Sequence, residues 1–202
     1  MRTLFLDLAS NHGALACMTE SEVTRLQPID HRMDDRGFVS LIQTMLDDAG
    51  WPYADLTCIA CVLGPGGFTS LRVGVAAANA LAGTLDIPSC GIHLSDLYGA
   101  RATQPNLWWL HSTKKHELFV RGFGAQAKEV PKARCVTIDE LPSLLWEGGI
   151  WMGELIPAHL ELIQSQGLTE AIVRPLQEIL PLLLSSQSSK KQTLEPWYGR
   201  GW

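Results

Sequence analysis

The residues of this chain best suited to chemistry form a glycine-rich turn from Gly64 to Thr69. Glycines and a proline force a tight turn here, and the free amides at the start of a following helix can cradle an anion. The turn therefore suggests phosphate binding. However, the stretch has no lysine, which a P-loop requires, and Thr69 stands where a dinucleotide-binding turn needs its third glycine. These residues alone favour a tight turn before a closely packed helix over a nucleotide site.

Other catalytic arrangements find little support. Asp7, Ser10 and His12 are close in sequence, but adjacency on a hairpin is not triad geometry, and no Gly-x-Ser-x-Gly elbow is present. No pair of histidines has the spacing that places two imidazoles on one helix face. Cys58 and Cys61 point to opposite faces of a strand, so we interpret them as buried thiols. We expect no catalytic residue, no metal site and no self-sufficient active site.

The glycine-rich turn is expected to connect a buried strand to an unusual helix. Leu56–Leu63 is short and apolar, as in a strand covered on both faces. The helix runs from Ser70 to Leu85, with Thr69 capping it, and Arg72 is its only charged residue. Because this helix shows almost no polar face, we expect its own sheet and a further surface to cover it.

A second helix is expected to begin at Asp34 or Asp35 and to end near Asp48. Its apolar positions form one broad face, which either packs on the sheet or joins the small-residue helix in binding a partner. Gly74, Ala78 and Ala82 are spaced to let another helix approach closely, which suits an interface and internal packing equally.

The remaining chain alternates strands and helices. We expect strands at Thr3–Ala9, Ala14–Met18, Val23–Leu26, Pro88–Ile92, Leu107–His111, Glu117–Phe123, Arg134–Ile138 and Ile150–Met152. Further helices are expected at Leu94–Ala102, Asp139–Trp146, Pro157–Ser165 and Leu168–Leu184, the last of them interrupted at Pro175 and Pro181. A hinge near Gln104–Asn106 divides the chain into lobes of residues 1–103 and 104–202.

Composition bounds the function. The chain has 202 residues, of which 46% are hydrophobic, as in a globular protein. Its net charge of −5 indicates that it lacks the basic surface that a protein needs to bind nucleic acid unaided. Five scattered cysteines indicate a reducing compartment. Because no segment reads as a signal peptide or a membrane span, we expect a cytoplasmic protein that does not bind membranes.

The stretch GPGGFTSLRVGVAAANALA resembles the signature of the TsaB (YeaZ) family, through Gly64, Pro65, Gly66, Phe68, Thr69, Leu71, Arg72 and Gly74. The opening strand and turn with Asp7 resembles the start of the actin-like ATPase superfamily. The closing Pro196-Trp197-Tyr198-Gly199-Arg200 is similar to the family's Pro-x-Tyr-Leu-Arg. His111, Ser112 and Thr113 replace the family's usual Asp-Ala-Arg.

The resemblance implies an α/β, actin-like ATPase (ribonuclease H-like) fold with two related lobes, mixed sheets and flanking helices. It further implies a non-catalytic scaffold that supports a TsaD-like transferase in threonylcarbamoylation of adenosine 37 of ANN-decoding tRNAs. The resemblance implies that a TsaE-like ATPase joins this pair and that the partners bind ATP and metal. It also implies that the chain contacts tRNA only through the complex, and that it forms a homodimer when its partner is absent. No cofactor is expected on this chain.

The resemblance also implies roles for two sets of residues. The partner interface would lie on Asp35–Ala49 and Thr69–Leu85, through Phe38, Leu41, Ile42, Met45, Leu71, Val75, Ala78 and Ala82. A degenerate remnant of a nucleotide site would comprise Asp7, Ser10, Gly64, Gly66, Gly67 and Thr69. Two alternatives stay open. One is a weak nucleotide hydrolase or glycoprotease-like peptidase that uses Asp7 and Gly64–Thr69, and the other is a homodimer whose helices serve only self-association.

Overall fold

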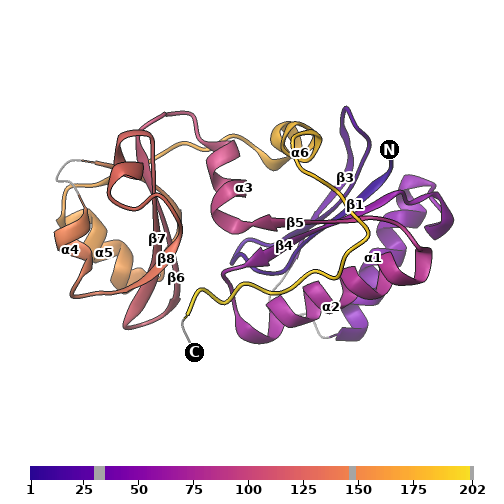
Figure 1. The fold of residues 1–202 in the computed structure, drawn as a ribbon, viewed down its shortest axis with the longest axis horizontal. Coiled ribbons are helices and arrows are strands. Elements are labelled where there is room, and N and C mark those ends of the chain that lie inside the picture. The colour runs from indigo at the N-terminus through magenta and orange to yellow at the C-terminus, as the bar shows by residue number, and fades with distance from the viewer. Residues whose placement is uncertain (30–34, 146–148, 201–202) are drawn as a thin grey trace. The chain divides into compact units, whose positions relative to one another are not determined.

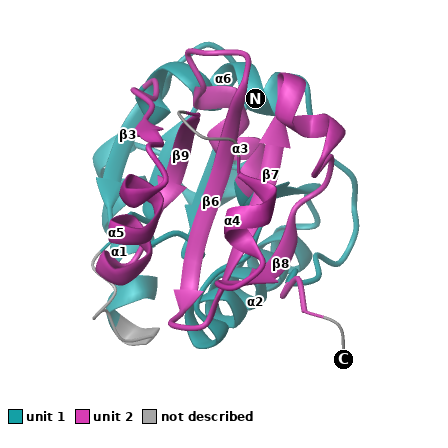
Figure 2. Ribbon diagram, turned by 90° about the vertical axis from the view of Figure 1, so that its left-hand side faces the viewer, with its two compact units in different colours: residues 1–94, 175–197 teal, residues 95–174, 198–202 magenta. Residues whose placement is uncertain are grey.

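The computed structural model describes residues 1–29, 35–145 and 149–200, which form two compact units. Unit 1 comprises residues 1–94 and 175–197, and unit 2 comprises residues 95–174 and 198–202 (Figure 2). Each unit is built around one five-stranded sheet with helices packed against it.

Unit 1 contains a mixed sheet with the strand order β3-β2-β1-β4-β5. Neighbours β1, β2 and β3 are antiparallel, while β4 and β5 run parallel to β1. The strands are β1 (Thr3–Asp7), β2 (Ala14–Met18), β3 (Val23–Pro28), β4 (Cys58–Gly64) and β5 (Ser89–His93). The buried strands β1, β2 and β4 are almost continuously apolar, as expected when both faces of a sheet are covered.

Helices cover both faces of this sheet. Figure 1 shows α1 and α2 on one face and α6 on the other. The helices of unit 1 are α1 (Asp35–Ala49), α2 (Phe68–Leu85) and α6 (Leu176–Ser185), together with the short 3-10 helix η1 (Tyr53–Asp55). Residues 186–197, which we call the C-terminal strap, complete the unit: Lys190 exchanges backbone hydrogen bonds with Ser89 at the start of β5.

Unit 2 repeats the same topology. Its sheet has the order β8-β7-β6-β9-β10, again with an antiparallel meander followed by two parallel strands. Its elements are α3 (Leu94–Arg101), β6 (Leu107–Lys114), β7 (Glu117–Phe123), η2 (Gly124–Lys128), β8 (Arg134–Thr137), α4 (Leu141–Leu144), β9 (Ile150–Glu154), α5 (Pro157–Ser165) and β10 (Thr169–Glu170). A cluster that includes Trp108, Leu118, Val120, Trp151 and Ile163 forms its core. The repeated strand order confirms the expected actin-like architecture of two related lobes.

We expected one boundary between residues 103 and 104, but the chain passes between the two units after residues 94, 174 and 197. The helix that follows the fifth strand of each sheet belongs to the other unit: α3 to unit 2, and α6 to unit 1. Residues 175–197, which we expected in the second lobe, therefore return to unit 1. Local sequence carries no signal for this exchange, because it depends on which sheet a helix covers.

The structure differs from three expectations for individual elements. In residues 168–184 the expected interruption at Pro175 is present, because α6 starts after it, but Thr169–Glu170 pairs with β9 as an edge strand and Pro181 lies inside α6 without interrupting it. The helix expected near Asp139–Trp146 is present as the shorter α4, Leu141–Leu144, and Trp146 lies outside the described residues. Helix α2 begins at Phe68 with Gly67 as its N-cap, so Thr69 lies inside the first turn and does not cap it. Asp34, the other expected cap, lies outside the described residues.

Candidate functional site: the glycine-rich turn and its helices

Asp7 ends β1 and is buried, and its carboxylate is used by its own loop. One oxygen accepts hydrogen bonds from the backbone N–H groups of Ala9 at 3.0 Å and Ser10 at 3.1 Å. The other accepts from the hydroxyl of Ser10 at 2.5 Å. This arrangement is an Asx-type turn, in which an aspartate side chain fixes the backbone of its own loop, here at Ala9 and Ser10. Asp7 and Ser10 thus lie together as expected, and they hold the loop between β1 and β2.

The glycine-rich turn is packed against other backbone of unit 1. Gly64 has a φ of +121°, and a Cβ on it would lie 2.3 Å from the carbonyl oxygen of Trp197. A Cβ on Gly66 would lie 2.3 Å from the carbonyl oxygen of Ala9. Any side chain at either position would therefore collide with main chain that cannot give way. The glycines here make room for the chain's own backbone.

Leu8 further closes this region against α2. Its side chain lies on Gly74, where a Cβ would be only 3.3 Å from the Cβ of Leu8. Gly67 and Thr69 are exposed on the turn and the first turn of α2. The structure thus brings Asp7, Ser10, Gly64 and Gly66 into one region and fills the space beside them with Leu8, Ala9 and Trp197.

Beyond its contact with β5, the C-terminal strap is held by α2 and by the end of β4. Asn79 of α2 donates a side-chain hydrogen bond to the carbonyl of Leu194 at 2.9 Å and accepts one from its N–H at 2.8 Å. The N–H of Trp197 donates to the carbonyl of Leu63 at 2.7 Å, and its ring meets His93 edge-on at 4.4 Å. The strap therefore follows α2 and reaches the glycine-rich turn (Figure 1).

The side chains expected at a partner interface lie mostly inside unit 1. Phe38, Ile42, Met45, Leu71, Val75, Ala78 and Ala82 are all buried, and Leu41 is half-buried. In the isolated chain these side chains pack toward the sheet, with α1 over β2 and β3, and α2 over β1, β4 and β5. Whether the two helices meet a partner stays a prediction, and the residues free to do so are on their other faces.

The exposed face of α2 forms a regular stripe. Phe68, Arg72, Ala76, Ala80 and Thr84 follow one another at intervals of four residues, which places them on one side of a helix. Phe68 is 51% exposed and lies under the Arg72 guanidinium at 3.9 Å from the ring centre. We call these five residues the α2 stripe. On α1, Val39 is 61% exposed beside the exposed Ser40, Gln43 and Thr44.

Unit 2 contains a serine–histidine contact that sequence reasoning did not find. Ser112 lies 2.7 Å from Nδ1 of His159, while Nε2 of His159 lies 2.9 Å from the carbonyl of Lys115. Because a carbonyl only accepts, Nε2 carries the proton, and the Ser112 hydroxyl donates to Nδ1. Both side chains are only 2% exposed, so this pair fixes α5 against the β6–β7 hairpin and is closed to a substrate.

A second buried cluster joins two strands and a helix of unit 2. Nδ1 of His111 lies 3.4 Å from the carboxylate of Glu154, which also accepts a hydrogen bond from the hydroxyl of Tyr98 at 3.0 Å. His111 stacks on Trp109, with the two rings nearly parallel and their centres 5.8 Å apart. Parallel pairing of β6 with β9 places His111 opposite Glu154, a proximity that no local spacing reveals.

All three residues that replace the family's Asp-Ala-Arg therefore make internal contacts. His111 faces Glu154, Ser112 bonds His159, and Thr113 accepts a hydrogen bond from Arg200 at 2.9 Å. In the described residues, no group of three or more His, Cys, Asp or Glu side chains is arranged to hold a metal ion. No helix in the same part of the chain is long and apolar enough to cross a membrane.

These features define an actin-like α/β protein whose glycine-rich turn is closed by its own chain. The sequence model of the TsaD family, described as tRNA N6-adenosine threonylcarbamoyltransferase, matches residues 34–156, which is more than half of the chain. The chain belongs to this family, and its similarity to TsaB (YeaZ) proteins confirms the resemblance that the residues indicated.

The chain is similar to three known proteins. The chain is 27% identical over 92 residues to the tRNA threonylcarbamoyladenosine biosynthesis protein TsaB of Escherichia coli, a match that covers 46% of this chain and 40% of that protein. It superimposes on YeaZ of Pseudomonas aeruginosa with a TM-score of 0.69 at 16% identity, covering 97% and 99% of the two chains. A Pseudomonas aeruginosa protein described as similar to the peptidase YeaZ gives a TM-score of 0.72 at 17% identity, covering 98% and 99%. At these identities the structural likeness establishes the fold.

Proposed function

We propose that this chain is a non-catalytic scaffold subunit that supports a TsaD-like transferase in threonylcarbamoylation of adenosine 37 of ANN-decoding tRNAs. The observation that carries the proposal is the closure of the glycine-rich turn. Ala9 and Trp197 place backbone carbonyls against Gly66 and Gly64, and the Asp7 carboxylate is committed to its own loop. The chain has the fold of a nucleotide-binding class, but its own residues occupy the space beside Asp7 and the glycine-rich turn.

The charge of the chain supports an indirect contact with tRNA. A net charge of −5 opposes the binding of a phosphate backbone. The transferase would therefore hold the tRNA, and it and a TsaE-like ATPase would bind ATP and metal. The name of the E. coli relative, a tRNA threonylcarbamoyladenosine biosynthesis protein, supports the same pathway. Because all five cysteines are free thiols, as in a reducing compartment, we infer a cytoplasmic location.

The exposed faces of α1 and α2 are the surface that we assign to the partner. The α2 stripe combines a half-exposed aromatic ring with two alanines that allow another helix to come close. Such a surface suits a helical partner, either the transferase or, in its absence, a second copy of this chain. The buried set from Phe38 to Ala82 would then support the interface from beneath by fixing both helices on the sheet.

The test compares two alanines on one helix. Ala80 is exposed on the α2 stripe, whereas Ala78 is fully buried. Ala80→Arg should keep the melting temperature and circular dichroism of the native chain and should abolish the one-to-one complex with the TsaD homologue of the same organism, measured by size-exclusion chromatography with light scattering. Ala78→Arg should instead unfold unit 1, because it buries an unpaired charge.

The control places the same charge on the other side of the unit. Gln177 is exposed on α6, so Gln177→Arg should leave the complex intact. A complex that survives Ala80→Arg would refute the assigned surface. If the native chain and the transferase do not associate at about 10 μM, where a specific interface of ordinary size is occupied, the scaffold proposal fails. ATP hydrolysis by the purified chain would favour the enzyme instead if it were lost in an Asp7→Ala variant that circular dichroism shows to be folded.

A further inference from the structure

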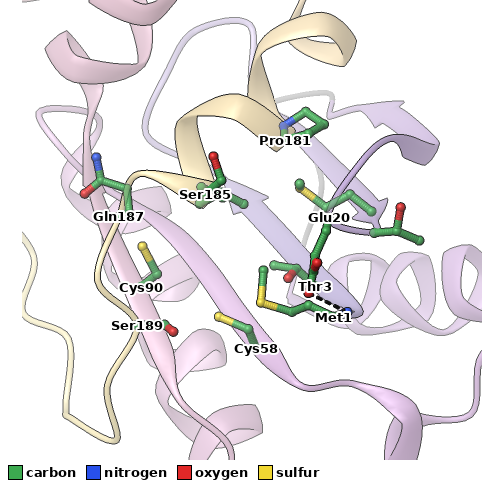
Figure 3. Close-up of a pocket in the computed structure, with 12 residues that line it drawn as sticks. Met1, Thr3, Glu20, Cys58, Cys90, Pro181, Ser185, Gln187 and Ser189 are labelled. Carbon is green, nitrogen blue, oxygen red and sulfur yellow. Dashed lines mark hydrogen bonds and ion pairs between the residues drawn. The ribbon is translucent and has the colours of Figure 1, made fainter.

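Unit 1 contains a cavity of about 430 Å³ on the face of its sheet that α6 covers. This volume is within the range of small-molecule sites. Figure 3 shows the residues around it, which come from four strands, from α6 and the strap, and from the turn after β2. They are Met1, Thr3, Met18, Thr19, Glu20, Cys58, Cys90, Pro181, Leu184, Ser185, Gln187 and Ser189.

Strand register explains why four of these residues form the floor. Thr3 of β1 is paired with Met18 of β2 on one side and with Cys58 of β4 on the other. Residues paired across adjacent strands share a face of the sheet. Cys90 of β5 is paired with Ala60, two positions beyond Cys58, and so shares that face. The floor is therefore one continuous row across neighbouring strands.

The hydroxyl of Thr3 is anomalous. Thr3 is fully buried and lines the cavity, yet its Oγ1 has no hydrogen-bond partner among the described residues. Other hydroxyls of the same sheet are paired: Thr24 donates to the carbonyl of Cys17 at 2.9 Å, and Ser89 to that of Gln192 at 3.0 Å. Valine has the same shape without this cost, so the unpaired Thr3 hydroxyl offers a hydrogen-bonding position to a molecule in the cavity.

The lining limits what that partner can be. Four sulfur atoms surround the cavity, from Met1, Met18, Cys58 and Cys90. Thioethers and thiols are polarisable and make favourable contacts with aromatic rings. Glu20 is the one charged side chain among the twelve lining residues, and it pairs with the Met1 ammonium at 3.1 Å. With no cationic side chain in the lining, an anionic ligand such as a phosphate or a carboxylate is disfavoured.

We propose that this cavity binds a small uncharged aromatic heterocycle, whose ring lies against the sulfur atoms of Met18, Cys58 and Cys90 and whose polar ring atom bonds the Thr3 hydroxyl. The site lies on the face of the sheet opposite α1 and α2. It is therefore independent of the partner surface, and neither proposal depends on the other.

The test uses indole as the probe and the methionine methyl groups as reporters. In a ¹³C-methyl-methionine spectrum of the full chain, indole should shift the Met18 signal through its ring current and leave those of Met45 on α1 and Met152 in unit 2 unchanged. A neutral ligand of this size should bind with a dissociation constant of about 1 mM. Cyclohexanol, similar in size and with a hydroxyl but no ring current or π face, should bind more weakly.

Two variants distinguish the contribution of the Thr3 hydroxyl to binding from that of the cavity. Thr3→Val should weaken indole binding roughly three- to tenfold, the effect of one hydrogen bond. Leu184→Phe should fill the cavity from α6 and remove binding altogether. The matched control is Thr57→Val, which alters a threonine whose hydroxyl is paired with Arg2 outside the cavity and should leave the affinity unchanged.

Three results would overturn the proposal. The first is an unshifted Met18 signal at about 10 mM indole, well above the expected dissociation constant. The second is equal binding of cyclohexanol and indole, which would remove the aromatic preference. The third is an undiminished affinity of either Thr3→Val or Leu184→Phe. If Thr3→Val did not fold, Leu184→Phe would decide alone.

Discussion

Asp7 shows how a residue that suggests catalysis can be structural. Its carboxylate accepts three hydrogen bonds from the two residues of its own loop and is 1% exposed. Chemistry on a phosphate would require at least one of these oxygens to be released. Leu8 and Ala9, which follow the aspartate, carry no hydroxyl that could help to hold a phosphate.

We expect Asp7→Ala to lower the free energy of unfolding by about 2–4 kcal/mol, because it leaves buried donors of Ala9 and Ser10 without an acceptor. Urea titration followed by circular dichroism measures the change. Asp47→Asn, which alters an exposed carboxylate on α1, is the control and should change stability by less than about 0.5 kcal/mol. Equal stability of Asp7→Ala and the native chain would contradict the structural role.

Glu117 makes unit 2 sensitive to acid. Burial acts to raise the pKa of Glu117, but hydrogen bonds and charge from Arg200, with smaller contributions from Cys135 and Lys114, outweigh it and hold the pKa below its ordinary value of 4.5. A carboxylate whose pKa is lower in the folded than in the unfolded state stabilises the fold above the unfolded pKa. This stabilisation is lost as the pH falls below about 4.5 and through the folded pKa.

Arg200→Met should therefore flatten the loss of stability below about pH 4.5, because the Glu117 pKa would return toward its ordinary value. Thermal unfolding between neutral and acidic pH measures this slope. The matched control is Lys191→Met, since Lys191 and Asp86 form an ion pair that is largely exposed and contributes little. A slope that Arg200→Met leaves unchanged would show that Glu117 does not depend on Arg200.

At the scale of elements, the side of a helix that packs on the sheet determines which residues stay available to a partner. Helix α2 carries small residues on nearly every side, and its sequence cannot show which side is covered. The sheet takes the side with Leu71, Val75, Ala78 and Ala82, and leaves the α2 stripe exposed. The same holds for α1, where the predicted interface residues Phe38, Ile42 and Met45 face the sheet.

We predict that Asn79 of α2 holds the C-terminal strap in place. Asn79→Ala removes both hydrogen bonds to Leu194, and each contributes about 1 kcal/mol. Hydrogen–deuterium exchange should show that the backbone amide of Leu194 exchanges roughly 30-fold faster, while the amides of β1 and β4 exchange at unchanged rates. Gln43→Ala, which removes an exposed side-chain hydrogen bond on α1, serves as the control. Unchanged protection of Leu194 would mean that Asn79 does not hold the strap.

At the scale of the whole molecule, unit 1 is assembled from two separated parts of the chain. Residues 175–197 contribute the buried side chains of Ile179, Leu180, Leu183, Leu184 and Leu194. Each such side chain contributes about 2 kcal/mol when buried, and their sum is comparable to the stability of a typical domain. The first lobe expected from the sequence, residues 1–103, lacks all of them.

We therefore expect a fragment of residues 1–103 to remain unfolded. A chain in which residues 1–94 are joined by a flexible linker to residues 175–197 should fold. Dispersion of amide signals in a ¹⁵N spectrum and the cooperativity of urea unfolding distinguish the two outcomes. Cooperative unfolding of the shorter fragment would show that α6 and the strap are dispensable.

The sequence by itself determined the local structure and the family. Glycine and proline at the turn, apolar strands and helical spacing predicted β1, β2, β7 and α5 within a residue or two, and the GPGGFT stretch and its helix indicated TsaB. These features are readable because backbone preferences and hydrophobic periods act over a few neighbouring residues.

Only the tertiary structure decided how these elements are used. It turned the predicted interface side chains inward, divided the chain between Leu94 and Ser95, and brought His111 to Glu154 and Ser112 to His159. It also left the Thr3 hydroxyl unpaired above a cavity. Each outcome depends on contacts between residues far apart in the chain, which sheet topology and register set, and no local pattern in the sequence records them.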